Sequence, residues 1–437
     1  AFYGLRSAVH GTKGRARSFA FTFVETGTNH MEKSIPPLTY TDRYRNEGTR
    51  TYSRHADYTE AEKPYRPDST QASFELPVFE LPCDQMLVYT ANPSRELEES
   101  YIGAERVRFL IHPQVLATKV DEAYVAHTLS MGKPCEPITA SPSSSTRTLY
   151  VQGHHAPHAV KVHFPFRISR YGRRMRDEVL EQAINVSKEL EGGIARMAGN
   201  FAFLREVIGV AHRNLDPGAP RGENWGYLVR DTTPFPRVNE ARTLLPGFAL
   251  YGRDFFDSGR ELLLFDLIGD RDPLRFIVEQ IMLPIVRHWV ACFLNFGYLM
   301  EPHGQNVLFE LSGDGEIRRI VHRDLSVGID MRRRRHIGLS DVGLNAYNRM
   351  EDDNFHSIAY DKFMGGHFFD RLVQACQERH PDLETEAFRQ PCRNEFTHLF
   401  PDHSHYFPPT IRYFSEDRDQ FGKPSYQDTG QRPLWRP

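Results

Sequence analysis

The stretch EPHGQNVLFE, Glu301–Glu310, combines an acid, an imidazole, a glycine and two side-chain amides within six residues and then becomes apolar. A long apolar segment, residues 273–300, precedes it, and a second run, residues 317–321, follows a Ser-Gly-Asp-Gly turn at 312–315. Glycine supplies the positive φ that a tight connection between two strands needs. The pattern therefore predicts a helix that leads into a loop of polar side chains and then into a β-hairpin.

The second run ends in His322-Arg323-Asp324, so the hairpin brings one further acid back toward the polar loop. We therefore expect five side chains to converge on one spot: Glu301, His303, Gln305, Asn306 and Asp324. A set that mixes carboxylates, amides and an imidazole suits a magnesium-bound phosphate better than zinc. The alternative is that Glu301 caps a helix while His303 and Asn306 only satisfy backbone groups in a tight loop.

The charge balance argues against a nucleic-acid partner. The 437 residues include 54 Lys and Arg against 57 Asp and Glu, which gives a formal net charge of -3 and no global basic field. The five cysteines are widely spaced and form no C-x-x-C pair, so a disulfide framework or a zinc finger is not expected. A reducing, cytoplasmic compartment is the simpler interpretation.

The most apolar segment, residues 274–300, contains four polar side chains: Arg275, Glu279, Arg287 and His288. These groups favour a buried helix, kinked near Pro284, over a membrane span. Residues 1–20 contain no apolar core of the length that a signal peptide needs. We therefore expect no association with a membrane.

Two stretches in the N-terminal half are rich in groups that bind anions. In Ser141–Thr148, small hydroxyl residues surround Arg147, and such a turn can donate several hydrogen bonds to phosphate oxygens, although serine-rich turns are often plain loops. Lys161–Ser169 alternates as a strand does, which puts five residues on one face: Lys161, His163, Pro165, Arg167 and Ser169. We expect Lys161, His163 and Arg167 to meet an anion there.

Other segments give coarser expectations. His10–Arg17 places glycines between cations, which suits an anion held by backbone N–H groups, and the alternative is a solvated basic terminus. Residues 28–72 are polar with little periodicity and are expected to wrap the surface or cross between subdomains, and the tail from Pro408 is expected to lie on the surface. Strands are predicted at 74–81, 85–90 and 107–111, and helices at 121–130, 177–190, 355–374 and 383–400.

The common nucleotide-binding and hydrolase motifs G-x-x-x-x-G-K-[ST], G-x-G-x-x-G, H-E-x-x-H and G-x-S-x-G do not occur. Instead, four blocks in order resemble the NRPS-independent siderophore synthetases, the aerobactin-synthetase-like family. They are Ile111–Gln114, Pro142–Thr148, Lys161–Arg173, and Glu301–Asn306 with the Arg323-Asp324 pair that follows. Arg432-Pro433-Leu434 is similar to the Asn-Pro-Leu end of the family.

The chain departs from the family pattern at its start. An early His-Pro-x-His-Pro-x-x-Lys block that contributes to acid binding in the family is not intact, and His10–Arg17 is interpreted as its remnant. The resemblance implies a mixed α+β fold with several subdomains in a palm, fingers and thumb-like arrangement, antiparallel sheets and a helical C-terminal part. It also implies an N-terminal region at 1–240 and a C-terminal region at 241–437.

The resemblance further implies an ATP-dependent ligase of siderophore biosynthesis, which adenylates citrate or a related carboxylic acid and condenses it with an amine, hydroxylamine or alcohol. The cofactors would be ATP and Mg²⁺, and the partners small molecules, with a homodimer as one option. Residues matched to ATP binding are Ser145, Arg147, Lys161, Arg173, His303, Gln305 and Asn306. Those matched to the acid substrate are Ser169, Arg173, His10 and Lys13, with Arg173 and His303 catalytic. Glu301 and Asp324 would bind magnesium.

Two other functions remain open from the residues. A kinase-like phosphotransferase also places Asn and Asp metal ligands around a strand and turn, but no Gly-rich loop or strand lysine precedes a helix glutamate here. A non-catalytic protein that keeps the fold and binds nucleotide is the second alternative. Release of pyrophosphate, release of ADP, or binding without turnover would separate the three.

Overall fold

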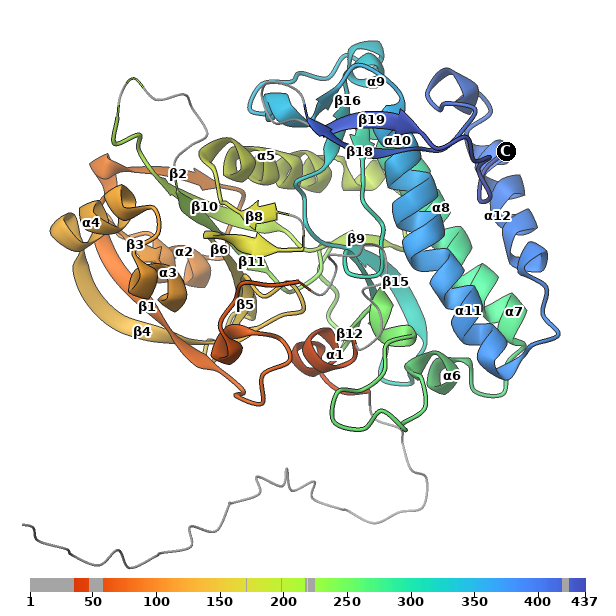
Figure 1. Ribbon diagram of the computed structural model, residues 1–437, viewed down its shortest axis with the longest axis horizontal. Helices are drawn as coiled ribbons and strands as arrows, with labels where there is room; N and C mark the ends of the chain where they lie inside the picture. The colour runs from red at the N-terminus through yellow and green to blue at the C-terminus, as the bar shows by residue number, and fades with distance from the viewer. Residues whose placement is uncertain are drawn as a thin grey trace, which may run out of the picture. The chain divides into compact units, whose positions relative to one another are not determined.

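The computed structural model describes residues 35–46, 58–169, 171–197, 199–216, 218, 225–418 and 424–437. Its largest sheet has eight strands in the order β2-β10-β11-β6-β5-β4-β1-β3, and every neighbouring pair is antiparallel (Figure 1). The strands are β1 Phe74–Pro82, β2 Met86–Thr90, β3 Arg106–Leu110, β4 Lys133–Pro142, β5 Thr148–Val151, β6 His158–Val162, β10 Glu206–His212 and β11 Gly226–Asp231.

Helices cover both faces of this sheet. On one face lie α2 Arg95–Tyr101, α3 Pro113–Thr118 and α4 Glu122–Met131, whose apolar side chains join the strands in one core. The amphipathic helix α5, Asp177–Gly193, packs on the other face over β10 and β11 (Figure 1). A side chain at Gly226 would come within 2.6 Å of Leu180 on this helix, so glycine permits the close approach.

A second, four-stranded sheet carries the predicted hairpin. Its order is β12-β14-β15-β9, with β12 Thr243–Pro246, β14 Val307–Leu311, β15 Ile317–His322 and β9 Phe201–Phe203. β14 and β15 pair antiparallel across the expected turn, where Gly315 has a φ of 79°. The hairpin predicted from the sequence is therefore confirmed.

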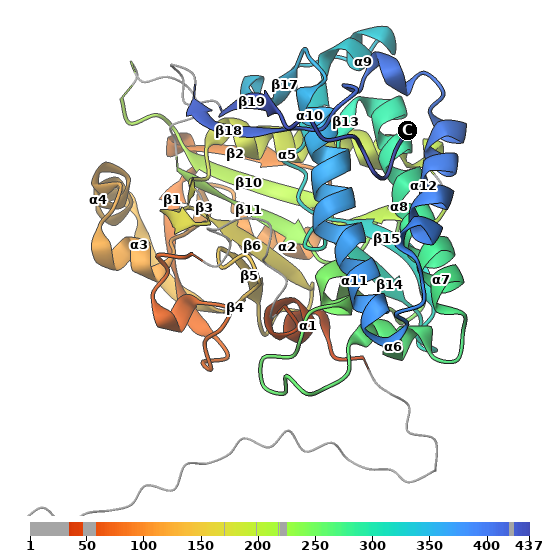
Figure 2. The same cartoon turned by 45° about the vertical axis from the view of Figure 1, so that its right-hand side comes forward.

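The predicted apolar helix precedes the hairpin as three continuous parts: α7 Pro273–Phe276, the π-helical η5 Ile277–Met282 and α8 Leu283–Phe296. The π-helical turns lie directly before Pro284, whose ring cannot donate a hydrogen bond to the preceding turn. This helix is long and apolar enough to cross a membrane by length and composition, but 67% of its most apolar window is buried inside the fold. Helix α12, Thr385–Leu399, packs along α8 (Figure 2).

The rest of the C-terminal part is mainly helical. It comprises α6 Leu263–Ile268, α9 Met331–His336, α10 Asn354–Ser357, the π-helical η7 Ile358–Phe369, α11 Asp370–Arg379, the small sheet β13 Tyr298–Leu299, β16 Gly328–Asp330 and β17 Arg349–Met350, and the hairpin β18 Arg412–Arg418 with β19 Pro424–Asp428. Short 3-10 turns are η1 Lys63–Tyr65, η2 Cys83–Gln85, η3 Ile194–Arg196, η4 Gly247–Leu250, η6 Ala346–Asn348 and η8 His403–His405. The predicted α+β class with antiparallel sheets and a helical C-terminal part is confirmed.

The end of the chain is not confined to the surface, as was expected from Pro408 onward. Trp435 and Arg436 are buried, and the Arg436 guanidinium forms an ion pair of 3.0 Å with Asp361 of η7. The reason is that Trp435 packs into the helical core beside Phe369, at 5.1 Å between ring centroids. The tail thus closes this part of the core.

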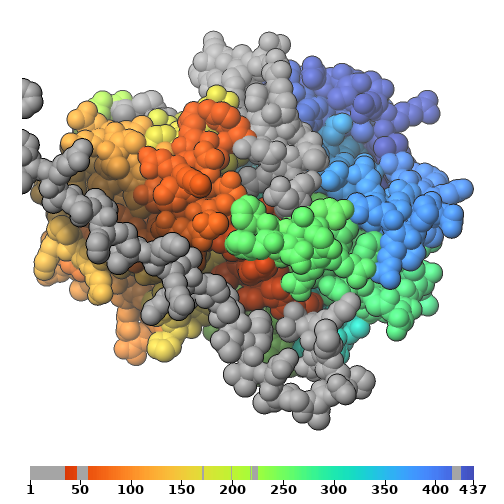
Figure 3. Space-filling view, turned by 60° about the horizontal axis from the view of Figure 1, so that its bottom comes forward, coloured from red at the N-terminus to blue at the C-terminus, as the bar shows by residue number. Residues whose placement is uncertain are grey.

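Helix α1, Leu38–Tyr44, crosses between segments that are distant in sequence. Arg43 donates to four backbone carbonyls on one side, those of Pro67, Ser69, Gln71 and Ala72. On the other side the carbonyl of Tyr44 accepts from the N–H of Phe255 at 2.9 Å. Figure 3 shows the red surface of α1 between the orange and green segments that it joins.

The described residues from 35 onward form one compact unit, which includes the predicted boundary at 240/241. Strand β9, before that boundary, pairs in parallel with β15, after it. The division into regions 1–240 and 241–437 stays a prediction.

Candidate active site

A cavity of about 550 Å³ opens between the large sheet, the loops that precede β14 and follow β15, and the C-terminal part. All ten predicted site residues within the described part of the chain line it: Ser145, Arg147, Lys161, Ser169, Arg173, Glu301, His303, Gln305, Asn306 and Asp324. His10 and Lys13 lie outside the described residues, so their assignment stays a prediction. Segments more than 100 residues apart therefore meet in one cavity.

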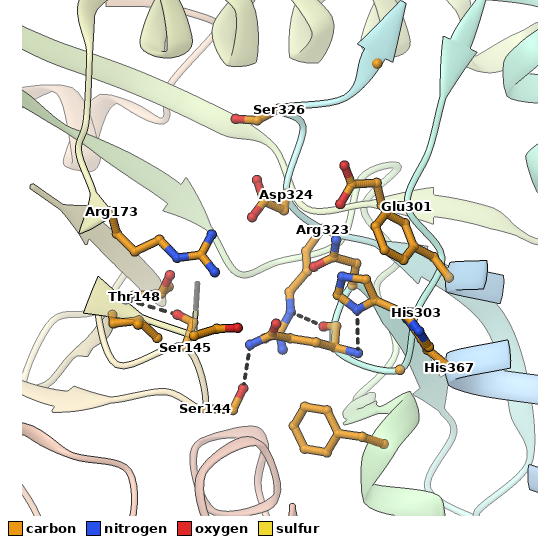
Figure 4. Close-up of a pocket in the computed structure, with 18 of the residues that line it drawn as sticks. Ser144, Ser145, Thr148, Arg173, Glu301, His303, Arg323, Asp324, Ser326 and His367 are labelled. Carbon is orange, nitrogen blue, oxygen red and sulfur yellow. Dashed lines mark hydrogen bonds between the residues drawn. The ribbon is translucent and has the colours of Figure 1, made fainter. Parts of the chain in front are cut away.

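The serine-rich turn between β4 and β5 forms one wall. Its hydroxyls are ordered by one another, since the Ser143 and Ser145 Oγ atoms lie 3.0 Å apart and Ser145 Oγ accepts from the N–H of Thr148 at 3.2 Å (Figure 4). Thr146 has a φ of 70°, in the left-handed region that is unfavourable for a β-branched residue. A turn held in this way presents hydroxyls to the cavity without further ordering.

The acid that the hairpin returns is bound by the sheet. Lys161 Nζ on β6 donates to both carboxylate oxygens of Asp324, at 2.9 and 2.8 Å. Burial opposes ionisation of the carboxyl, but the charges of Lys161 and Arg230 outweigh it and hold the pKa of Asp324 far below its usual range. Asp324 is thus an anion at neutral pH, and its backbone has a φ of 71°.

The two arginines from the matched blocks have different environments. Arg147 Nη1 donates to the backbone carbonyl of Arg173 and contacts Sδ of Met175, each at 3.0 Å. Burial, and then the charge of Arg173, lowers the pKa of Arg147 to about 9, so it remains a cation at neutral pH. The Arg173 guanidinium points into the cavity and has no hydrogen-bond or ion-pair partner among the described residues (Figure 4).

The EPHGQN loop forms the opposite wall. His303 Nδ1 accepts from the N–H of Gln305 at 3.2 Å, and the Gln305 amide donates to Ser144 Oγ across the cavity at 3.1 Å. Burial lowers the pKa of His303 to about 3. Because Nδ1 of this neutral ring is an acceptor, Nε2 carries the proton and is available as a donor. A side chain at Gly304 would lie 2.5 Å from the hydroxyl of Tyr251, so the loop needs glycine there.

Glu301 faces the same cavity as Asp324 (Figure 4). Burial, and then the negative charge of Asp324, raises the pKa of Glu301 to about 7. Within the described ranges no group of three or more His, Cys, Asp and Glu side chains could hold a metal ion. Two carboxylates are nevertheless the donor set that fits magnesium when phosphate oxygens and water complete its shell. A nearby cation would also relieve the repulsion that raises the pKa of Glu301.

The prediction that alternate residues of Lys161–Ser169 share one face of a single strand is wrong. β6 ends at Val162, and residues 164–168 form a separate hairpin, β7 with β8 Tyr171–Arg173. His163, between the two strands, bonds to Asp121 at 2.7 Å, and the exposed Arg167 lies over the ring of Tyr58. Because the strand changes its pairing partner at His163, the alternation does not continue, and neither His163 nor Arg167 lines the cavity.

The sequence analysis did not predict a buried hydrogen-bonded cluster behind the cavity, which is centred on Asp42. Asp42 of α1 accepts two hydrogen bonds from Arg323, at 2.8 and 2.9 Å, and one each from Ser144 and Tyr150. Arg323 belongs to a matched block, but nothing in the local sequence of α1 marks Asp42 as its partner. Similarly, Arg230 lines the cavity and is held by the buried Glu206 at 2.5 and 2.9 Å.

The cavity is chemically two-sided. Its Lys and Arg side chains, within the described residues, come from strands β6, β8 and β11, the β4–β5 turn and the loop after β15: Arg147, Lys161, Arg173, Arg230 and Arg323. The side formed by residues 347–426 carries no Lys, Arg, Asp or Glu: it consists of Tyr347, Asn348, Met350, Phe355, Phe363, His367, Tyr413, Phe414 and Tyr426. Anionic groups of a ligand are therefore favoured on the first side, and uncharged groups on the second.

Residues 70–252 match the profile of the IucA / IucC family. This match identifies these residues as an IucA / IucC family region, and the resemblance expected from the sequence is confirmed. No curated protein gives a significant match to the chain by sequence.

Among solved structures, the fold is similar to that of the petrobactin biosynthesis protein AsbB of Bacillus anthracis, with a TM-score of 0.67 and 13% identity over 92% of this chain and 76% of that one. ATP-bound aerobactin synthetase IucA of a hypervirulent Klebsiella pneumoniae gives 0.65 and 13% over 91% and 78%. Aerobactin synthetase IucC of that pathotype gives 0.62 and 12% over 84% and 70%. At these identities the likeness shows a common fold.

Proposed function

We propose that this protein is an ATP-dependent ligase of siderophore biosynthesis, which activates a carboxylic acid as an acyl-adenylate and transfers the acyl group to an amine, hydroxylamine or alcohol. The observation that carries the proposal is one cavity lined by residues from three of the four matched blocks, namely Pro142–Thr148, Lys161–Arg173, and Glu301–Asn306 with the Arg323-Asp324 pair. The family match over residues 70–252 and the fold shared with an ATP-bound aerobactin synthetase support it.

In the first step, a carboxylate oxygen of the acid attacks the α-phosphorus of ATP and pyrophosphate leaves. Negative charge then spreads over the phosphoryl oxygens, where donors that are already oriented stabilise it most. Arg173 is the cation available to meet this charge, and the Ser145 hydroxyl and the Nε2–H of His303 are fixed donors on the two sides of the cavity. In this proposal Arg173 and His303 are the catalytic residues.

Other side chains orient the substrates. Lys161 and Arg147 add positive charge beneath the phosphates, and Gln305 and Asn306 offer amide donors and acceptors. Ser169 directly follows β7, within the β7–β8 hairpin that carries Arg173, which suits a contact with the carboxylic acid. Magnesium, held by Glu301 and Asp324 together with phosphate oxygens, would neutralise charge on the polyphosphate.

In the second step, the nucleophile attacks the acyl carbonyl carbon, and the bond from that carbon to the phosphate oxygen breaks. AMP leaves with that oxygen, and the nucleophile loses one proton to solvent. No covalent bond to the protein is required, so alignment of the reactants supplies much of the rate. The uncharged aromatic side of the cavity is suited to the parts of the substrates without charge, the nucleobase or the carbon skeleton of the nucleophile. We place the reaction in the cytoplasm, with small-molecule partners.

The experiment that tests this function incubates the purified protein with ATP, magnesium and a panel of carboxylic acids, with polyamines, hydroxylamines or alcohols as nucleophiles. The proposed ligase releases AMP and pyrophosphate only when an accepted acid is present. Release of ADP would favour the kinase-like alternative, and nucleotide binding without turnover would favour the non-catalytic one. The family match supports the ligase over both.

A further inference from the structure

Asp42 lies outside the cavity, yet every one of its side-chain hydrogen bonds reaches a part of the cavity wall or its support. The residue is fully buried on α1. Its Oδ1 accepts from Arg323 at 2.9 Å and from Ser144 at 2.8 Å, and its Oδ2 accepts from Arg323 at 2.8 Å and from Tyr150 at 2.6 Å. Two oxygens thus receive four hydrogen bonds, which fixes the carboxylate on all sides.

The partners of Asp42 belong to three separate segments. Ser144 is in the serine-rich turn, Tyr150 is on β5, and Arg323 directly follows β15. These residues are 102, 108 and 281 positions from Asp42 in the sequence. The carboxylate is therefore a junction between the sheet side of the cavity and the hairpin side.

Arg323 extends this junction to the substrate-facing residues. Its Nε donates to the backbone carbonyl of Gln305 at 2.7 Å, and its N–H donates to the carbonyl of Asn306 at 2.9 Å. Its successor, Asp324, has a φ of 71°, in the left-handed region that is uncommon for residues other than glycine, asparagine and aspartate. Ser144, the second partner of Asp42, also accepts a hydrogen bond from the side-chain amide of Gln305.

We propose that Asp42 is a positioning residue for the ligase reaction, which holds Arg323 and Ser144 so that Asp324 and Gln305 face the bound nucleotide in the reactive arrangement. The proposal rests on the proposed function for its catalytic readout, but its structural content is independent of it. Asp42 itself does not line the cavity, so it acts through these partners rather than on the substrate.

The electrostatics of the junction are consistent with this role. Burial opposes ionisation of Asp42, but the charge of Arg323 and the hydrogen bonds from Arg323, Tyr150 and Ser144 outweigh it and lower the pKa of Asp42. Arg323 is likewise buried, so loss of the carboxylate would leave a guanidinium without its counter-charge. The loops that contain Arg323 and its acceptors Gln305 and Asn306 would then rearrange so that the guanidinium reaches water.

The test compares Asp42→Asn with a matched control, Asp254→Asn. Asp254 is also a buried aspartate bound to α1, through the hydroxyl of Tyr40 at 2.9 Å and Arg45 at 4.0 Å, but it does not line the cavity. At a temperature where both variants are folded, we expect kcat for acid-dependent ATP–pyrophosphate exchange to fall about 100-fold in Asp42→Asn, with a smaller change in KM for ATP. Asp254→Asn should retain kcat within about threefold, because its loss affects stability alone.

A second variant and a second readout keep the test decisive. Tyr150→Phe keeps the ring but removes the hydroxyl that donates to Asp42 at 2.6 Å and accepts from Arg323 Nη1 at 3.2 Å. This variant should fold even where Asp42→Asn does not, and should lower kcat about threefold to tenfold. Hydrogen–deuterium exchange should speed up at residues 143–146 and 303–306 in Asp42→Asn and in Tyr150→Phe, and not in Asp254→Asn.

These results separate the two proposals. Absence of turnover in the wild type would count against the ligase function, while hydrogen–deuterium exchange at residues 143–146 and 303–306 would still report on the role of Asp42. The positioning role would be overturned if hydrogen exchange in these segments stayed at the wild-type rate in a folded Asp42→Asn or Tyr150→Phe variant. It would also be overturned by equal losses of kcat in Asp42→Asn and Asp254→Asn.

Discussion

The ammonium group of Lys161 donates to both carboxylate oxygens of Asp324, at 2.9 and 2.8 Å, across 163 positions of sequence. Lys161 belongs to the large sheet and Asp324 to the loop after the β14–β15 hairpin, so this contact joins the sheet to the hairpin at the cavity wall. It also keeps Asp324 ionised, which a ligand of magnesium requires. The pair is therefore both a structural joint and a part of the proposed site.

Asp324→Asn should leave the protein folded and lower magnesium-dependent adenylation by about 100-fold or more, because the amide keeps the shape and an acceptor for Lys161 but loses the charge. The matched control is Asp314→Asn, an exposed acid in the turn of the same hairpin. Thermal unfolding and ATP–pyrophosphate exchange measure the two effects. Equal activity in both variants would remove Asp324 from the site.

Arg173→Ala should weaken binding of ATP by about tenfold to a hundredfold with little change in thermal stability, because its guanidinium has no protein partner in the described part of the chain. Arg147→Ala should also lower the free energy of unfolding, by about 1–3 kcal/mol, since it removes a buried donor to the carbonyl of Arg173. Titration with ATP and denaturant unfolding test this. The exposed neighbour Arg174→Ala is the control, and ATP affinity unchanged in Arg173→Ala would refute the assignment.

Glu301→Gln should change how stability depends on pH. The pKa of Glu301 is raised from 4.5 to about 7 by burial and by Asp324, so between these pH values the folded protein binds a proton that the unfolded chain releases. The free energy of unfolding of the wild type therefore carries a contribution that falls as pH rises through this window. Relative to the wild type, Glu301→Gln should gain stability from pH 4.5 to 7, by at most about 3 kcal/mol.

This comparison is made without nucleotide or magnesium, by denaturant unfolding of both proteins at each pH. Taking the difference between variant and wild type cancels the titration of the other buried acids and histidines. A difference that stays constant across the window would show that Glu301 titrates normally in the folded protein.

Ser169→Gly separates a role in binding from a role in folding. Ser169 has a φ of 61°, which glycine adopts without strain, so the variant should be about as stable as the wild type. If its hydroxyl contacts the acid, KM for the acid should rise about tenfold. Asn92→Gly is the control, because Asn92 has a φ of 42° and does not line the cavity. The same KM in both variants would exclude a contact between Ser169 and the acid.

Much of the site was predictable because its residues occur in short blocks. The EPHGQN loop, the hairpin and Asp324 follow one another within 24 positions, and local turn and strand patterns place them together. The resemblance to a family then brought in Ser145, Arg147, Lys161, Ser169 and Arg173, which line the same cavity in the structure. The roles of these residues in catalysis remain predictions.

The parts that the sequence did not predict depend on tertiary pairing. Asp42 meets Arg323 over 281 positions, and a single aspartate on a seven-residue helix gives no local sign of that contact. The alternation of polar and apolar residues continues through Lys161–Ser169 in the sequence, but the strand changes its pairing partner at His163. The sequence pattern alone does not reveal this change. The tail from Pro408, which includes Trp435, was predicted to lie on the surface because it is rich in Pro, Tyr and charge, whereas the Trp435 ring is buried beside Phe369.

The release of nucleotide products tests the central claim most directly. Purified protein is mixed with ATP, magnesium, each carboxylic acid of the panel and the polyamine, hydroxylamine and alcohol nucleophiles. AMP, ADP, phosphate and pyrophosphate are then quantified, with Arg173→Ala as the inactive reference and Arg174→Ala as the active one. The ligase account predicts equal amounts of AMP and pyrophosphate, formed only with an accepted acid and lost in Arg173→Ala. Release of ADP in place of AMP, or ATP binding with no product for any acid, would contradict it.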